Sequence, residues 1–146
     1  MCGIVGFSNF DLNKQKSLSI LKRMSKKIKH RGENDQGIFC CGKTFLAHRR
    51  LSVIDIAGGH QPMSFCFGGT TLTIVYNGEI YNTKKLAKIL AKHNIFLKTA
   101  CDTEIVLKLF AIYKEKCVKL LNGIFAFCIF DEANNKLFLA RDQIGV

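Results

Sequence analysis

The apolar and polar residues in the first half of the chain follow two different periods. Apolar side chains in residues 15–29 recur every three or four positions, which predicts an amphipathic helix with one buried face: Leu18, Leu21, Met24 and Ile28. Short apolar runs at 3–8, 38–41 and 44–47 are typical of strands, and the Gly-Lys pair between the last two can form their turn. The pattern therefore predicts a strand, a helix and a β-hairpin in that order.

The second half alternates between the same two periods. The expected elements are a strand at 71–76, a helix after the possible caps Asn82 and Thr83, a helix from Asp102 or Thr103, and strands at 124–130 and 136–140 around a turn at Asn134 and Asn135. Strands in groups with helices between them favour an α+β layered sandwich over a simple βαβ fold. No glycine-rich phosphate loop follows a strand, so we expect no nucleotide site.

Size and composition limit the class of protein further. With 146 residues and 48% hydrophobic content, the chain is expected to form one domain with a substantial core. No apolar run reaches the roughly 18 residues of a membrane-spanning helix, and the N-terminus lacks the features of a secretion signal. We therefore expect a cytoplasmic protein that has no membrane partner.

The seven cysteines are odd in number and show neither a CxxC pair nor a metal-binding Cys/His spacing. We expect reduced thiols, mostly buried, and no metal site. The net charge of +11 could indicate nucleic-acid binding, but 17 of the 22 basic residues are lysines. They lie mainly on the outer faces of the expected helices, without the arginines or interleaved aromatics typical of nucleic-acid readers. A solvated lysine-rich surface is therefore favoured over a nucleic-acid partner.

Cys2 is the first candidate for chemistry. If Met1 is removed, Cys2 carries both a thiol, with a pKa near ~8.5, and an α-amine, with a pKa near ~8. The amine can then take the thiol proton at neutral pH. This is the N-terminal-nucleophile arrangement, in which one residue supplies the attacking atom and the base. The structural alternative is a cysteine that begins a strand buried by Ile4 and Val5.

Four polar clusters lie at the ends of the expected elements, where sites are usually built: residues 30–37, 47–55, 76–82 and 101–104. Taken singly, each cluster also has a structural explanation. The pair Asn77 and Gly78 can form a turn, Asp102 can cap a helix, and Arg50 can be a surface charge.

Taken together with Cys2, these clusters resemble the class II glutamine amidotransferases. The closest resemblance is to the N-terminal glutaminase domain of glutamine-hydrolysing asparagine synthetase. The strings that carry it are MCGIVG, HRG, AHRRLSVID, GHQPM, YNGEIYN, CDTEI, NGIFAFCIFD and LARDQIG, which run from residue 1 to residue 145. The resemblance implies an α+β fold, a four-layer αββα N-terminal-nucleophile hydrolase sandwich.

The resemblance also implies how glutamine is held. Arg50 matches the arginine that takes the α-carboxylate, and Asp102 matches the aspartate that pairs with the α-ammonium. Glu79 matches a second contact to the amino end. Backbone atoms of four consecutive residues are expected to line the pocket: Leu51, Ser52, Val53 and Ile54.

By the same resemblance, Cys2 attacks the side-chain amide and forms a γ-glutamyl thioester, which water hydrolyses to glutamate. The side-chain amide of Asn77 and the backbone N–H of Gly78 would stabilise the oxyanion. His48 is an alternative general base, although supporting roles are expected for His48 and for the pair His30 and Arg31. Neither a metal nor an organic cofactor is expected in this domain.

The sequence ends within a family string, so we expect residues 1–146 to be a truncated glutaminase domain, incomplete at its C-terminal end. The family's ATP-dependent synthetase domain, which uses ATP and magnesium to convert aspartate to asparagine, is not in this sequence. The expected partners are glutamine and a synthetase domain or chain that receives ammonia, and a homodimer is left open. Two alternatives remain: an amidotransferase with another acceptor, such as a sugar in polysaccharide biosynthesis, and an inactive truncated remnant.

Overall fold

The computed structural model describes residues 2–8, 11–51 and 58–145. The strands in these ranges are β1 (Gly3–Phe7), β2 (Asp35–Cys41), β3 (Thr44–Arg50), β4 (Met63–Phe67), β5 (Thr70–Ile80), β6 (Gly123–Asp131) and β7 (Lys136–Arg141). The helices are α1 (Lys14–Lys27), α2 (Thr83–Lys92) and α3 (Asp102–Tyr113), with 3-10 helices η1 (Lys29–Arg31) and η2 (Lys114–Leu120). No helix in the described part of the chain combines the length and hydrophobicity that crossing a membrane requires.

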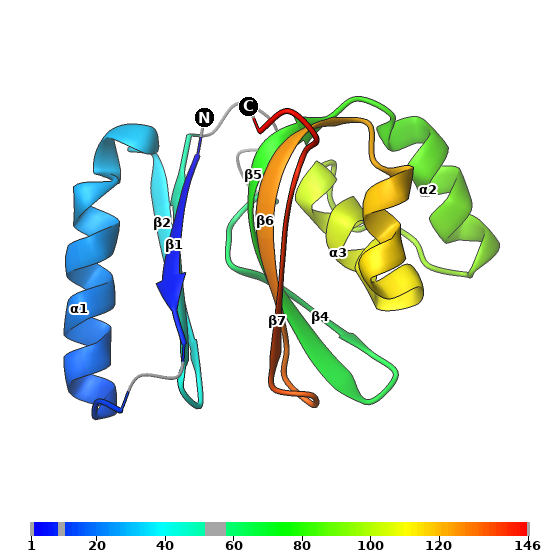
Figure 1. Cartoon of the computed structure of the whole chain (residues 1–146). Coiled ribbons are helices and arrows are strands. Elements are labelled where there is room, and N and C mark those ends of the chain that lie inside the picture. The colour runs from blue at the N-terminus through cyan, green and yellow to red at the C-terminus, as the bar shows by residue number, and fades with distance from the viewer. Residues whose placement is uncertain (1, 9–10, 52–57, 146) are drawn as a thin grey trace.

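These elements stack in four layers (Figure 1). Helix α1 covers one sheet of order β1-β3-β2, which faces a second sheet of order β4-β5-β6-β7, and α2 with α3 covers the outer face of the second sheet. Every pair of neighbouring strands is antiparallel. The expected α+β sandwich with αββα layers is thus confirmed.

Successive side chains of β3 point to opposite faces of the first sheet, so β3 packs against α1 on one face and the second sheet on the other. Leu46 points into the interface between the sheets and packs with Val75, Cys128 and Phe130. Phe45 and Ala47 point the other way and pack with Leu21 of α1. Strand β3 therefore packs against α1 with one face and against the second sheet with the other.

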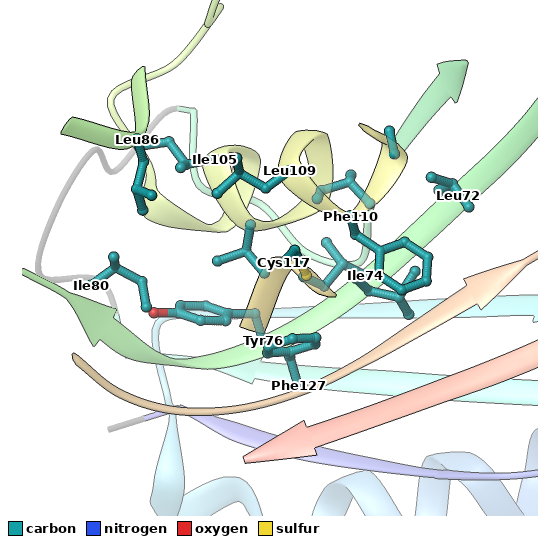
Figure 2. Close-up of a cluster of buried hydrophobic side chains, with 14 of the residues drawn as sticks. Leu72, Ile74, Tyr76, Ile80, Leu86, Ile105, Leu109, Phe110, Cys117 and Phe127 are labelled. Carbon is teal, nitrogen blue, oxygen red and sulfur yellow. The ribbon is translucent and has the colours of Figure 1, made fainter. Parts of the chain in front are cut away.

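The largest apolar cluster lies between the second sheet and the helices. It includes Ile74 and Tyr76 of β5, Phe127 of β6, and Leu109 and Phe110 of α3 (Figure 2). Helix α3 is buried along nearly its whole length, so its first residue, Asp102, is held firmly against β5. This packing brings the start of α3 to the last part of β5, where Asp102 contacts Tyr76 and Ile80.

The predicted elements are found with shifted ends, and three details differ from expectation. Strand β5 continues to Ile80, so the pair Asn77 and Gly78 lies within a strand and the turn interpretation is wrong. Strand β4 was not anticipated from the pattern. Asn82 stands before α2 but does not cap it through its side chain: its Oδ1 accepts the N–H of Asn122 at 3.1 Å, and its Nδ2 donates to the Leu120 carbonyl at 2.9 Å.

Candidate active site

A cavity of about 230 Å³ opens where the ends of β3 and β5 meet the start of α3. Its walls contain every predicted site residue that the structure describes: Cys2, Arg50, Leu51, Asn77, Gly78, Glu79 and Asp102. The other three predicted residues, Ser52, Val53 and Ile54, lie outside the described residues. Segments that are far apart in the sequence are thus brought to one cavity by the two-sheet packing.

Cys2 lies at the cavity wall, directly before β1. Gly3 pairs with Arg49, so the register of the two strands places Cys2 beside the end of β3. The backbone N–H of Leu51 donates to the Cys2 sulfur at 3.4 Å, and the Leu51 carbonyl lies 3.8 Å from the same sulfur. The thiol is therefore oriented by a backbone donor and acceptor of one neighbouring residue.

Arg50, the last residue of β3, is only 6% exposed although it carries a charge. A Cβ atom added to Gly59 would overlap its guanidinium group and lie 2.8 Å from the sulfur of Cys101. Glycine at position 59 therefore leaves the space in which the guanidinium packs. A cation held in this way beside a cavity is suited to a carboxylate ligand, because the planar group can donate two parallel hydrogen bonds.

Asn77 and Gly78 lie in β5, opposite Ala126 and Phe125 of β6. A Cβ atom at Gly78 would collide with the Ile124 carbonyl and the backbone of Phe125, so the close approach of β6 requires glycine there. Glu79, the next residue, is exposed and lies at the mouth of the cavity. The pair that was expected to stabilise an oxyanion is thus built into a rigid central strand.

Asp102 is held by β5 and does not act as a helix cap through its side chain. Its Oδ2 accepts the Tyr76 hydroxyl proton at 2.7 Å and the Ile80 backbone N–H at 3.1 Å. Burial, together with the negative charge of Asp102, raises the pKa of Tyr76 far above its usual value, so the hydroxyl stays a donor. The carboxylate is therefore present at the cavity in one fixed orientation.

The cavity thus contains a thiol, a cation and an anion, each from a different element of the fold. Arg50 and Asp102 carry the two charges that the carboxylate and ammonium groups of an amino acid require. Among the described residues, no group of three or more His, Cys, Asp and Glu side chains could hold a metal ion. The chemistry available is nucleophilic attack by sulfur on an amino-acid ligand.

His48 lies outside this cavity. It is fully buried between the sheets, and burial lowers its pKa to about 4. Its Nε2 lies 3.0 Å from the Tyr76 carbonyl, which can only accept, so Nε2 carries the proton. His30 and Arg31 lie in η1 and line a separate cavity of about 260 Å³, which shares only Leu51 with the first.

Sequence reasoning assigned no role to six other residues that line the first cavity: Gly59, Gln61, Tyr76, Cys101, Thr103 and Ile124. All six belong to the motif strings: Gly59 and Gln61 to GHQPM, Tyr76 to YNGEIYN, Cys101 and Thr103 to CDTEI, and Ile124 to NGIFAFCIFD. The strings place these residues near the site, but their contacts follow from strand pairing and from the packing of α3.

The cavity thus brings the thiol of Cys2 together with one cationic and one anionic side chain. Comparison with known families agrees: the model of the glutamine amidotransferase domain matches residues 1–146. The chain belongs to this family.

Curated relatives cover the whole of this chain. Asparagine synthetase [glutamine-hydrolyzing] 3 of Bacillus subtilis is 41% identical over 146 residues, and the nodule asparagine synthetase [glutamine-hydrolyzing] of Pisum sativum is 36% identical over 147 residues. The match covers 24% of each of these relatives, so the chain spans about a quarter of their length.

Among solved structures, glutamine phosphoribosylpyrophosphate amidotransferase of Bacillus subtilis matches 99% of this chain and 37% of its own. The TM-score is 0.74 at 21% sequence identity. At this identity the likeness supports the fold, and it agrees with the layers seen in Figure 1.

Proposed function

We propose that this chain hydrolyses the side-chain amide of glutamine through a thioester on Cys2. The observation that carries the proposal is the meeting of Cys2, Arg50 and Asp102 in the walls of one cavity. Membership of the glutamine amidotransferase domain family supports glutamine as the amino acid. A site that holds both charged groups of the substrate discriminates strongly against amides that lack them.

In the first step, the Cys2 thiolate attacks the amide carbon while the α-amine of the same residue holds the thiol proton. This assignment requires removal of Met1. The negative charge that develops on the amide oxygen is met by the side chain of Asn77 and the N–H of Gly78. One such donor typically contributes about a hundred- to a thousandfold in rate.

In the second step, the C–N bond breaks and the leaving nitrogen takes the proton from the α-amine, which releases ammonia and leaves a thioester. Water then attacks the thioester carbon, and the C–S bond breaks to give glutamate and the free thiol. In this proposal Arg50 and Asp102 hold the substrate throughout, with Glu79 as a further contact to its amino end. Neither step uses a cofactor.

We propose further that the ammonia is delivered to an ATP-dependent synthetase that converts aspartate to asparagine. The support is that the relatives are named asparagine synthetases, which favours aspartate over a sugar as the acceptor. In this proposal ATP and magnesium act in the synthetase part. The odd number of cysteines, with no CxxC pair among them, supports a reducing compartment such as the cytoplasm.

The proposal is tested by exposing the full chain to an electrophilic diazo-ketone analogue of glutamine and measuring the intact mass. We expect one adduct on Cys2 of a chain that lacks Met1, slowed by excess glutamine, together with glutamate release from glutamine. A Cys2→Ala variant should give neither the adduct nor glutamate. A Cys66→Ala variant, which removes an exposed thiol from β4, should behave like the wild type.

Labelling spread over Cys101 and the other thiols, without protection by glutamine, would contradict the proposal. So would an intact Met1 in a chain that still releases glutamate, because the α-amine of Cys2 would then be blocked.

A further inference from the structure

Gln61 makes hydrogen bonds that a backbone would normally make. Met63 of β4 pairs with Ile74 of β5, and continuing that register by two residues places Gln61 opposite Tyr76. Here the side chain takes over: the Tyr76 N–H donates to Gln61 Oε1 at 2.6 Å, and Gln61 Nε2 donates to the Tyr76 carbonyl at 3.1 Å. Gln61 is 4% exposed, so these bonds are shielded from water.

The same amide also reaches α3. Gln61 Nε2 lies 3.2 Å from Thr103 Oγ1, and Thr103 directly follows Asp102. The Tyr76 hydroxyl donates to Asp102 from the other end of the residue, and His48 donates to the Tyr76 carbonyl from the first sheet. Tyr76 is thus fixed at its N–H, its carbonyl and its hydroxyl. Figure 2 shows its ring packed between β5 and α3.

Tyr76 connects two functional groups of the proposed site. It immediately precedes Asn77, whose side chain is the proposed oxyanion donor, and its hydroxyl orients Asp102, the proposed ammonium ligand. A shift of Tyr76 along or across the strand would move both groups. Misplacement by about 1 Å in a site that depends on orientation can cost about a hundredfold in rate.

We propose that Gln61 is a positioning residue for glutamine hydrolysis: its side-chain amide fixes Tyr76 and thereby sets the places of Asn77 and Asp102. This inference rests on the proposed function. Its amide is occupied by Tyr76 and Thr103, so Gln61 acts through these residues and not by touching the reacting atoms.

The test is the Gln61→Glu variant of the full chain, assayed for glutamate release between pH 6 and pH 8.5. An ionised carboxylate has the same shape and still accepts the Tyr76 N–H, but its second oxygen repels the Tyr76 carbonyl. A protonated carboxyl group donates to that carbonyl again. We therefore expect kcat at pH 8 to fall about 10- to 100-fold, and the ratio of variant to wild-type kcat to rise as the pH falls.

A matched control is Gln15→Glu, which makes the same change at an exposed position on α1. Its activity should follow the wild type at every pH. A Gln61→Glu variant whose kcat equals the wild type at pH 8 would overturn the inference and leave the proposed function standing. A loss that does not recover at low pH would also overturn it, because a general packing defect has no reason to respond to protonation. Absence of glutamate release by the wild type would instead overturn the proposed function, and this inference with it.

Discussion

The two charged ends of the cavity are supported in different ways. On the Asp102 side, a buried ion pair between Glu104 and Lys108 stabilises the entry to α3, with both side chains less than a tenth exposed. On the Arg50 side, a hydrogen bond joins Asp35, opposite Arg50 in the register of β2 and β3, to Nδ1 of His60. Its two side chains are 34% and 59% exposed, respectively.

The two pairs also differ in the number of hydrogen bonds that their side chains make. The Glu104 carboxylate accepts the backbone N–H groups of Lys98 and Thr99 and the Thr99 hydroxyl, in addition to Lys108. Lys108 also donates to the Phe96 carbonyl. The comparison indicates that the Asp102 end of the cavity is supported by the folded core, while the Arg50 end depends on close packing around Arg50 itself.

The largest expected effect comes from breaking the buried pair with Glu104→Ala. This change leaves the Lys108 charge buried without its partner and removes the acceptor for the loop before α3. We expect the free energy of unfolding to fall by about 3–5 kcal/mol, measured by urea unfolding. Glu115→Ala, which removes an exposed carboxylate from η2, should change it by less than about 0.5 kcal/mol.

The double variant Glu104→Leu with Lys108→Met sharpens this result. Since replacing both members of a buried pair avoids an uncompensated charge, it should lose less stability than Glu104→Ala. A double variant that is less stable than the single one would contradict the role of the pair and assign the stability to the loop contacts alone.

On the Arg50 side, the expected effect falls on substrate binding. In Gly59→Ala the new methyl group overlaps the guanidinium of Arg50 and must displace it. We expect KM for glutamine to rise roughly 30-fold, since a charge-assisted hydrogen-bond pair contributes about 1.5–3 kcal/mol. Steady-state kinetics of glutamate release measures this, and an unchanged thermal midpoint shows that the fold is intact.

The sequence could predict the features that depend on local patterns. Period and turn signals were enough for α1, the hairpin of β2 and β3, and the antiparallel pair β6 and β7. The motif strings predicted which residues gather at the cavity, because short polar runs lie at the ends of these elements. Motif strings of this kind predict which residues lie at the cavity, but they do not predict which residues contact one another.

Strand β4 could also have been predicted locally, because it forms a hairpin with Thr70–Ile74 of β5 across the positive-φ pair Gly68 and Gly69. The remaining features depend on packing between separate segments. The Gly59 contact with Arg50 joins the segment before β4 to the end of β3, and the Gln61 contact with Tyr76 continues the register of β4 and β5 through a side chain. No local signal encodes either contact.

A smaller effect is expected from Tyr76→Phe, which removes one hydrogen bond to Asp102 on the buried side. The ring keeps its place in the core, while Asp102 Oδ2 keeps only the Ile80 N–H as a donor among the described residues. We expect KM for glutamine to rise roughly tenfold, with a smaller change in kcat. Tyr113→Phe, which removes a hydroxyl bonded to His93 on the helical side, is the matched control and should leave KM unchanged.

The smallest effect is expected where the comparison began, at the exposed pair of Asp35 and His60. Burial opposes ionisation of Asp35, but hydrogen bonds from His60 and the Gln36 N–H outweigh it and hold the pKa of Asp35 below its usual value. A lowered folded-state pKa contributes stability above the unfolded value of about 3.9, which is lost as the pH falls through the folded value.

We therefore expect Asp35→Asn to lower the free energy of unfolding by less than about 1 kcal/mol at pH 7, as is usual for exposed pairs. The difference from the wild type should shrink as the pH is lowered through the acidic range, measured by urea unfolding at a series of pH values. A loss as large as that of Glu104→Ala, or one that persists below the folded pKa of Asp35, would remove the distinction between the two ends of the cavity.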